Sequence, residues 1–228
     1  MASTEWSGLP AGMREEEYAR LGEILDDLCP EATLEIGMAN GGSTLVLCEF
    51  LKKQGHGKHT AIDPFQTAPK GWAGKGVERV RQAELDSWYE LLEELDYLAL
   101  PRLVAAQKTF DFILIDGWHS FDYTLLDLFY ADLLLKENGV LAVHDTGWPA
   151  VYKACRFLET HKPYDRLSPP IAVAIPTLIG RLARRIGQIV RGPKSYQEAR
   201  SRREQWFSLG VYRKRANHQV PDAFFAPF

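Results

Sequence analysis

Apolar and polar positions along the chain form blocks that predict strands and helices in alternation. Residues 14–28 place apolar side chains at helical spacing among acidic ones, which predicts an amphipathic N-terminal helix. Short apolar runs predict strands. The clearest is "FDFILID" (110–116), because a strand covered on both faces is apolar at nearly every position. The predicted strands cover residues 32–37, 59–63, 77–83, 110–116, 139–145 and 207–215.

Helical patterns occupy most of the segments between these strands. Asn138 and Gly139 form a common helix stop, and Pro149 suits the first turn of a helix. Strands that alternate with helices are typical of a parallel, doubly wound sheet, so the pattern predicts an α/β fold in a single domain over residues 1–228. The predicted helices cover residues 14–28, 43–53, 85–100, 120–136 and 149–160.

The composition is that of an ordinary globular protein, with 46% hydrophobic and 25% charged residues. The sequence has no run of about 18 apolar residues and no apolar stretch of the secretory type at its start, so we expect a cytoplasmic protein. Its cysteines are far apart and lack metal-binding spacing. We therefore expect reduced thiols at Cys29, Cys48 and Cys155 rather than disulfides or a zinc site.

Charge is unevenly distributed along the chain. Residues 1–150 hold 12 Lys and Arg against 25 Asp and Glu, whereas residues 151–228 hold 15 against 5. The basic part is predicted to be a helical insertion over residues 168–205, in which residues 177–191 place apolar and arginine side chains on opposite faces. This helix could pack against the acidic part of the same chain or of a second copy, form a lid over a ligand site, or lie peripherally on an anionic membrane. Nucleic-acid binding is not expected, because the net charge is −3 and no RNA-binding motif occurs.

An acidic residue lies at the end of four predicted strands, and histidines His119 and His144 accompany two of these acids. In a parallel sheet the carboxyl ends of the strands meet at one edge, where ligands bind. We therefore expect a reactive site there. The alternative is that each acid only caps a helix or a loop. The four acids are Glu35, Asp63, Asp116 and Asp145.

The turn after the first strand, "EIGMANGGST" (35–44), indicates what the site holds. Glycine lets the backbone approach a ligand closely, and the following helix offers free N–H groups to an anion. The second glycine of the dinucleotide fingerprint, which admits a pyrophosphate, is missing after Gly37. Asp63 is placed to bind a ribose hydroxyl pair. Ribose without room for pyrophosphate favours S-adenosylmethionine.

The chain resembles class I S-adenosylmethionine-dependent methyltransferases. More narrowly, it resembles the bacterial branch of macrocin and mycinamicin sugar O-methyltransferases, and more distantly catechol O-methyltransferase. The resemblance implies a Rossmann-like sheet of seven strands with an antiparallel last strand, and a small-molecule or glycan acceptor in polysaccharide or natural-product tailoring. It rests on "LEIGMANGGST", "AIDPFQ", "FDFILIDGWHSFDYTLLDLFYADLLLKENGVLAVHD" and "SLGVYRKR".

The resemblance also implies which residues bind the cofactor. The glycine turn would surround the methionine moiety, with Ser43 at its carboxylate. Asp63 would hold the ribose, and two residues after the third predicted strand would contact the adenine. The predicted cofactor-binding residues are Glu35, Gly37, Asn40, Gly41, Ser43, Asp63, Asp86 and Ser87.

The same resemblance implies the catalytic residues. An alcohol is a poor nucleophile until its proton leaves, and His119 matches a histidine proposed as the general base. Asp116 and Asp145 match ligands of a divalent metal such as Mg²⁺. His144 stands where the metal-dependent sugar enzymes carry an acid, so a softer metal, or none, is the alternative. The sequence therefore predicts His119 and Asp116 as catalytic, and Asp116, His144 and Asp145 as metal ligands.

Aromatic residues near the same edge are predicted to form walls of an acceptor pocket. They are Trp72, Trp118 and Trp148. Two other functions are compatible with the sequence, because a fold alone does not set a function. One is an NAD(P)-dependent oxidoreductase on a Rossmann-like scaffold, and the other is a non-catalytic cofactor-binding or scaffold protein.

Overall fold

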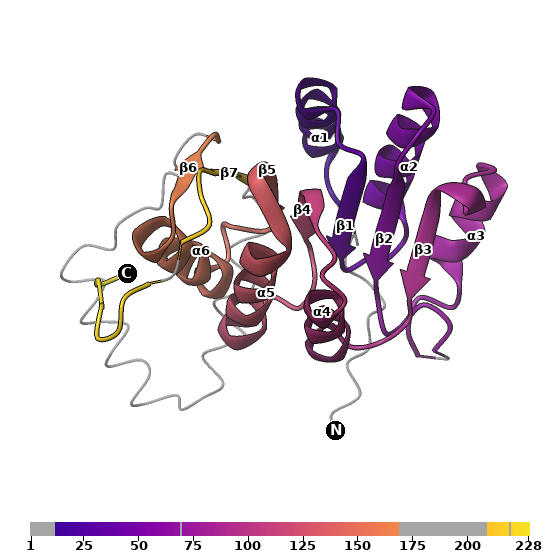
Figure 1. Ribbon diagram of the computed structural model, residues 1–228. Coiled ribbons are helices and arrows are strands. Elements are labelled where there is room, and N and C mark those ends of the chain that lie inside the picture. The colour runs from indigo at the N-terminus through magenta and orange to yellow at the C-terminus, as the bar shows by residue number, and fades with distance from the viewer. Residues whose placement is uncertain (1–11, 69, 169–208, 219) are drawn as a thin grey trace.

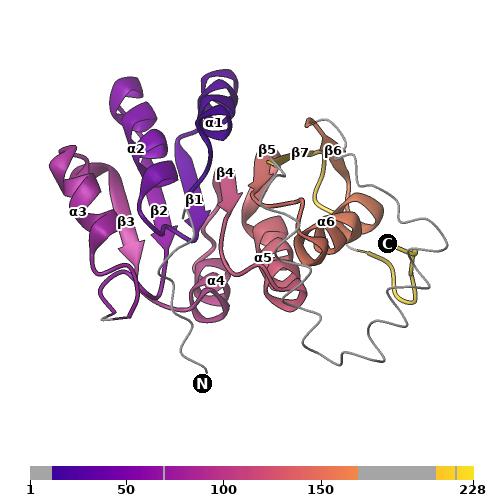
Figure 2. The same cartoon turned by 180° about the vertical axis from the view of Figure 1, so that it is seen from behind.

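Seven strands form a central sheet with helices on both faces (Figures 1 and 2). The computed structural model describes residues 12–68, 70–168, 209–218 and 220–228. The strand order is β3-β2-β1-β4-β5-β7-β6, and β7 runs antiparallel to both of its neighbours, β5 and β6. The strands are β1 (Ala32–Ile36), β2 (Lys58–Ile62), β3 (Tyr89–Leu92), β4 (Phe110–Ile115), β5 (Leu135–Val143), β6 (Tyr164–Arg166) and β7 (Gly210–Lys214).

The helices cover the sheet in two layers. Successive side chains of a strand point to opposite faces. In β4, Ile113 packs in the core cluster of α4, α5 and α6, whereas its neighbour Phe112 packs with α1 and α2. This alternation explains why β4 is apolar at nearly every position. The helices are α1 (Glu15–Leu28), α2 (Gly42–Gln54), α3 (Lys75–Gln82), α4 (Asp96–Ala105), α5 (Phe121–Leu134) and α6 (Pro149–His161).

The predicted doubly wound fold with an antiparallel last strand is confirmed, but the third strand was misplaced. Residues 77–83, predicted as a strand, belong to helix α3. Val77 and Val80 are three residues apart, a spacing that serves one face of a helix, and Val80 is buried. Gly74, with a φ of 74°, starts the helix in the left-handed conformation.

The third strand lies instead within residues 85–100, which were predicted to be one helix. This segment contains a 3₁₀ turn (Asp86–Trp88), then β3, then the start of α4. β3 pairs with β2 and covers only one edge of the sheet, so its side chains are partly exposed and lack the fully apolar pattern of a central strand. Pairing with β2 decides its conformation, and the local sequence does not.

The end of α5 was also predicted too late. The helix ends at Leu134, and β5 begins at Leu135, so that Asn138 and Gly139 lie inside the strand. The pairing of β5 with β4 is irregular there, and Asn138 has a φ of 66°. The turn-forming residues therefore mark an irregularity in a strand rather than a helix stop. The short strand β6 was not predicted.

The predicted basic insertion over residues 168–205, with its amphipathic segment 177–191, lies outside the described part of the chain, apart from Ser168.

Among the described residues, the helices are all too short or too polar to cross a membrane. The cysteines are free thiols, of which Cys48 and Cys155 are buried.

A pair of acidic residues lies between α4 and α5. Asp127 is fully buried, and neither of its carboxylate oxygens accepts a hydrogen bond from the described residues. Burial, together with the neighbouring Asp96, raises the pKa of Asp127 well above its usual value. Burial also raises the pKa of Asp96. Burial and the neighbouring carboxyl group therefore both favour the protonated form of Asp127.

We expect Asp127→Asn to stabilise the protein at pH 8. Because the pKa of Asp127 is higher in the folded than in the unfolded chain, stability falls as pH rises from about 4 through the folded value. Asparagine does not titrate. The variant does not undergo this pH-dependent loss, so its Tm should exceed that of the unmodified protein by a few degrees at pH 8 and by little at pH 4.

Thermal denaturation at both pH values measures this effect. Asp122→Asn is the control, because Asp122 lies on the same helix and its pKa is lowered by Ser120, so this variant should not be stabilised. The same pH dependence of Tm in Asp127→Asn and the unmodified protein would contradict the prediction.

Candidate active site

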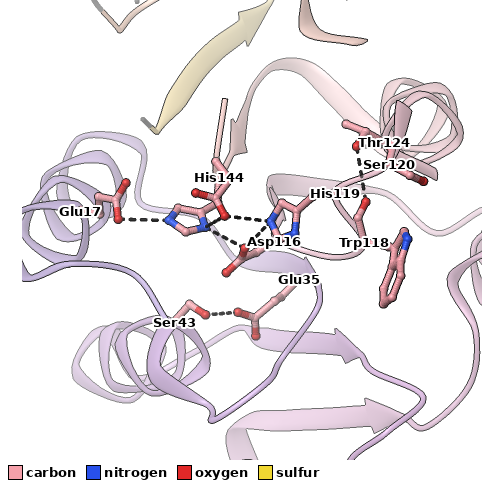
Figure 3. A network of polar contacts seen from close by, with 10 residues as sticks. Glu17, Glu35, Ser43, Asp116, Trp118, His119, Ser120, Thr124 and His144 are labelled. Carbon is pink, nitrogen blue, oxygen red and sulfur yellow. Dashed lines mark hydrogen bonds and ion pairs between the residues drawn. The ribbon is translucent and has the colours of Figure 1, made fainter. Parts of the chain in front are cut away.

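The loops that follow β4 and β5 bring four polar residues together at the carboxyl edge of the sheet (Figure 3). Asp116 follows β4 directly, and His119 lies in the loop between β4 and α5. His144 and Asp145 follow β5. One ligand atom from each of the four residues lies within 4.8 Å of the others. The sequence pattern predicted this convergence because parallel strands end at a common edge.

His144 occupies the centre of this group. Its Nδ1 lies 2.8 Å from Asp116 Oδ1 and 3.7 Å from Asp145 Oδ2. Its Nε2 lies 3.1 Å from Glu17 Oε2, on helix α1. Figure 3 shows Glu17 and Asp116 on opposite sides of the imidazole ring. His144 therefore links the loops after β4 and β5 to the N-terminal helix.

His119 lies on the more exposed side of the group. Its Nε2 is 3.0 Å from Asp145 Oδ2 and 3.8 Å from Asp116 Oδ1. Its ring stacks on Trp148, with centroids 5.3 Å apart. The stacking and the Asp145 contact fix the ring, and its side chain remains 32% exposed. An acceptor molecule can therefore reach it.

The carboxylates and imidazoles shift one another's pKa values. Burial alone would raise the pKa of Asp116, but His144 and His119 hold it well below its usual range. Burial alone would lower the pKa of His119, but Asp116 and Asp145 raise it to about 9. Burial alone would also lower the pKa of His144, but Asp116 and Glu17 raise it to about 11. Without a bound ion, both histidines are cations at neutral pH.

The donor atoms also suit a divalent metal ion. Two ligands bound side by side at about 2.1 Å place their donor atoms about 3 Å apart. The 2.8 Å separation between His144 Nδ1 and Asp116 Oδ1 is of that size. An imidazole among two carboxylates favours a transition ion over Mg²⁺, which prefers oxygen ligands. A carboxylate behind a ligating histidine, as Glu17 stands behind His144, is a common feature of metal sites.

Glu35, the last residue but one of β1, is fully buried and faces the first turn of α2. The Ser43 hydroxyl donates to Glu35 Oε1, and the Thr44 hydroxyl donates to Oε2 at 2.6 Å. The N-cap of α2 is Gly41, so the two hydroxyls do not cap the helix but hold Glu35. Among the described residues no side chain caps α2, so its first N–H groups can receive an anion.

Asp63 holds the glycine turn against the loop after β2. It is 3% exposed and accepts hydrogen bonds from the backbone N–H groups of Ala39 and Phe65, both at 2.8 Å. Gln66 Nε2 donates a third bond at 3.0 Å. Burial raises the pKa of Asp63 above its usual value. A carboxylate has about four lone-pair positions, so about one remains for a ribose hydroxyl.

The glycines of the turn allow protein segments to approach one another. A Cβ at Gly37 would lie 2.2 Å from the backbone oxygen of Asp116, and one at Gly41 would lie 3.0 Å from that of Gly76. Both glycines have positive φ, 96° and 76°. The carbonyl of Asn40 accepts a hydrogen bond from Arg79 at 3.1 Å. The turn adjoins an open hollow of about 410 Å³ lined by Asn40, Ala73, Gly74, Lys75, Glu78 and Arg79.

The prediction that Asp86 and Ser87 contact the cofactor is wrong in its premise. They were placed after the third strand, but they precede β3 and so lie at the amino end of that strand. The side chain of Lys58, the first residue of the parallel strand β2, donates to the backbone oxygen of Ser87. Ser87 therefore lies at the amino end of the sheet, opposite the edge that carries the candidate site. The carboxyl end of β3 is followed instead by Glu93 and Glu94.

The three predicted wall tryptophans have different surroundings. Trp148 packs on His119 and lies at the site. Trp118 is 45% exposed and lies in the same loop as His119 (Figure 3). Trp72 lies in the loop after β2, where its backbone N–H bonds the Phe65 carbonyl. Trp148 and Trp118 can therefore flank an acceptor near His119.

Two residues of α1 that the sequence reasoning missed also reach the site. Glu17 contacts His144, and the Tyr18 hydroxyl occupies the space that a Cβ on Gly42 would need, 2.1 Å away. A signal for Glu17 was present in the sequence. It lies four residues before Leu21, so it belongs to the apolar, buried stripe of the helix and not to its solvated face.

Residues 34–146 match the family described as a methyltransferase domain. The cofactor-bound protein Rv0187 from MTB has a similar fold, with a TM-score of 0.65 and 17% identity over 92% of this chain and 85% of that one. The O-methyltransferase TomG from Streptomyces achromogenes, solved in complex with SAM, gives 0.58 and 18% over 69% and 74%. An O-methyltransferase from Bacillus cereus, in complex with SAH, gives 0.57 and 20% over 69% and 76%. No curated protein matches the chain.

We expect Gly37→Ala to destabilise the protein more than Gly55→Ala. Both glycines have a similar φ, 96° and 86°, but the Cβ position of Gly55 is open while that of Gly37 meets the Asp116 backbone. Gly55→Ala thus isolates the cost of the backbone conformation, about 1–2 kcal/mol. Displacing the Asp116 loop should add at least about 1 kcal/mol. Chemical denaturation compares the free energies of unfolding, and equal losses in both variants would rule out the close loop contact.

Proposed function

This chain is a class I methyltransferase by its fold and its methyltransferase domain, and we propose that it methylates a hydroxyl oxygen with S-adenosylmethionine as donor. The observation that carries the proposal is the position of His119, Asp116 and Asp145 beside the glycine turn at one edge of the sheet. The similar folds solved with SAM or SAH include two O-methyltransferases, which supports both the donor and the acceptor atom. We propose a small molecule or a sugar as the acceptor.

The cofactor would lie across the ends of β1 and β2. The uncapped first turn of α2 would hold the methionine carboxylate, and Asp63 would hold the ribose. The adenine would face the residues after β3, beginning with Glu93 and Glu94, in place of Asp86 and Ser87. Acids around the site suit a positively charged sulfonium. When bound, S-adenosylmethionine supplies an electrophilic methyl group.

His119 would act as the general base. Asp145 Oδ2, 3.0 Å from Nε2, would favour the tautomer with the proton on Nε2, so that Nδ1 would keep a lone pair for the proton of the acceptor hydroxyl. During transfer of the methyl group, Nδ1 would accept the proton that the acceptor hydroxyl loses. Trp148 keeps the ring in place. The protein mainly aligns the two reactants and excludes water.

Asp116, Asp145 and His144 would hold a divalent ion beside His119. Such an ion lowers the pKa of an alcohol and orients its oxygen. The ion would also offset the negative charge of the two carboxylates, and so lower the pKa of His119 toward the range of an effective base.

Location and assembly remain predictions. We propose a cytoplasmic enzyme that forms homo-oligomers or contacts membranes peripherally through residues 177–191. Flotation with anionic liposomes tests the membrane contact, because a protein that never floats does not bind the membrane.

The alternative function, an NAD(P)-dependent oxidoreductase, is tested by calorimetric titration with NAD and with S-adenosylhomocysteine. Binding of NAD alone would replace the methyltransferase proposal.

We expect His119→Ala to lower kcat by about 10²- to 10⁴-fold, the usual contribution of a general base. The Kd of S-adenosylhomocysteine should change by less than about threefold, because the cofactor is held by other residues. His56→Ala is the control, since His56 is an exposed histidine beside Glu31. Turnover equal to that of His56→Ala would remove His119 from the mechanism.

We expect chelation to lower turnover and to shift its pH dependence. A base must be deprotonated, so turnover rises with pH through its pKa, which is about 9 for His119 in the metal-free site. With an ion on Asp116 and Asp145 the rise should occur at lower pH. Turnover is measured from pH 6 to 10 after EDTA treatment, and again after adding back Mg²⁺, Mn²⁺ or Co²⁺. Identical profiles would show that no ion takes part.

A further inference from the structure

Glu17 differs from the other acids at the start of α1. The first turn of this helix carries Glu15, Glu16 and Glu17, but only Glu17 is buried, with 2% of its surface exposed. Its Oε2 accepts the backbone N–H of Arg14 at 2.9 Å and lies 3.1 Å from His144 Nε2. It meets His144 from a position 127 residues away in the sequence.

Capping alone does not explain this placement. An exposed glutamate at the third helical position can accept the same backbone N–H group. Burying a carboxylate is costly unless it is paired, and Glu17 is paired with His144. The position of Glu17 is therefore better explained by what it does to the imidazole.

A carboxylate at one ring nitrogen determines what the other nitrogen can do. Glu17 and Asp116 both only accept hydrogen bonds, so His144 carries a proton on each ring nitrogen when no ion is bound. An ion on Asp116 and Asp145 would displace the proton of Nδ1, which lies 2.8 Å from Asp116 and 3.7 Å from Asp145. Glu17 would then hold the remaining proton on Nε2 and orient the lone pair of Nδ1 toward the ion.

We propose that Glu17 is a positioning residue that holds His144 as a nitrogen ligand, so that the site takes a transition ion such as Co²⁺, Mn²⁺ or Zn²⁺ in preference to Mg²⁺. The proposal rests on the metal site of the proposed function. Helix α1 lies outside residues 34–146, which match the methyltransferase domain, and in this proposal it completes the metal site. Its neighbour Tyr18 contacts the cofactor turn at Gly42, so both halves of the site depend on α1.

The test is titration of the metal-free full-length protein with Co²⁺ alone, followed by its visible absorption. Glu17→Gln keeps an oxygen for the Arg14 N–H group, because glutamine also serves at this capping position. It should weaken Co²⁺ binding by about 10- to 100-fold and alter the absorption bands. Glu16→Gln is the matched control, because it removes the same charge from an exposed residue of the same helical turn. It should leave Co²⁺ binding unchanged.

Making the Glu17→Gln substitution in the His144→Ala variant distinguishes an effect of Glu17 through His144 from a general loss of structure. In His144→Ala, the effect of Glu17→Gln on Co²⁺ affinity should fall below about threefold, because the two residues act as a unit. The unmodified protein should bind Co²⁺ more tightly than Mg²⁺ in competition. Equal Co²⁺ affinity in Glu17→Gln and the unmodified protein overturns the proposal, as does an equally large effect in the His144→Ala background.

Failure of the proposed function has a different signature. If the unmodified protein binds no Co²⁺, the role of Glu17 is overturned, but binding of S-adenosylhomocysteine, measured separately, still supports a methyltransferase. If Co²⁺ binds as expected and S-adenosylhomocysteine does not, the metal site stands and the methyltransferase proposal fails.

Discussion

The contact between Asp116 and His144 joins the parts of the active-site edge. Asp116 ends the central strand β4 and His144 follows its neighbour β5, so the 2.8 Å contact fixes two loops to each other. Glu17 extends it to α1. Charged groups removed from water must be paired, and a single unpaired member would be strongly destabilising. The conformations of these loops are therefore coupled.

A second set of buried acids shapes the cofactor side in the same way. Glu35 receives the hydroxyls of Ser43 and Thr44 under the glycine turn, and Asp63 receives N–H groups on either side of it. Gly37 then brings this turn against the backbone of Asp116. The cofactor turn and the catalytic loop thus touch directly. This contact gives a physical basis for holding a methyl donor and an acceptor oxygen in line, where alignment contributes most of the rate.

The proposed function needs one edge of the sheet to attract both a sulfonium and a metal ion. Acids at the strand ends attract cations, and histidines among them can act as bases, ligands or counter-ions according to what is bound. In the proposed metal site, His144 would supply a nitrogen donor. Glu17, on a different element, would supply a negative charge behind it.

The sequence by itself determined the class of fold and the edge where the chemistry lies. Apolar runs ending in Asp63, Asp116 and Asp145 implied strands of one parallel sheet, because burial on both faces requires such runs and parallel strands share a carboxyl edge. Tertiary structure decided the rest. Strand pairing with β2 placed β3 after Asp86 and Ser87, and packing of α1 brought Glu17 to His144. Such choices depend on contacts between residues distant in sequence, and a local hydrophobic pattern, which only reports which side of an element is buried, does not specify them.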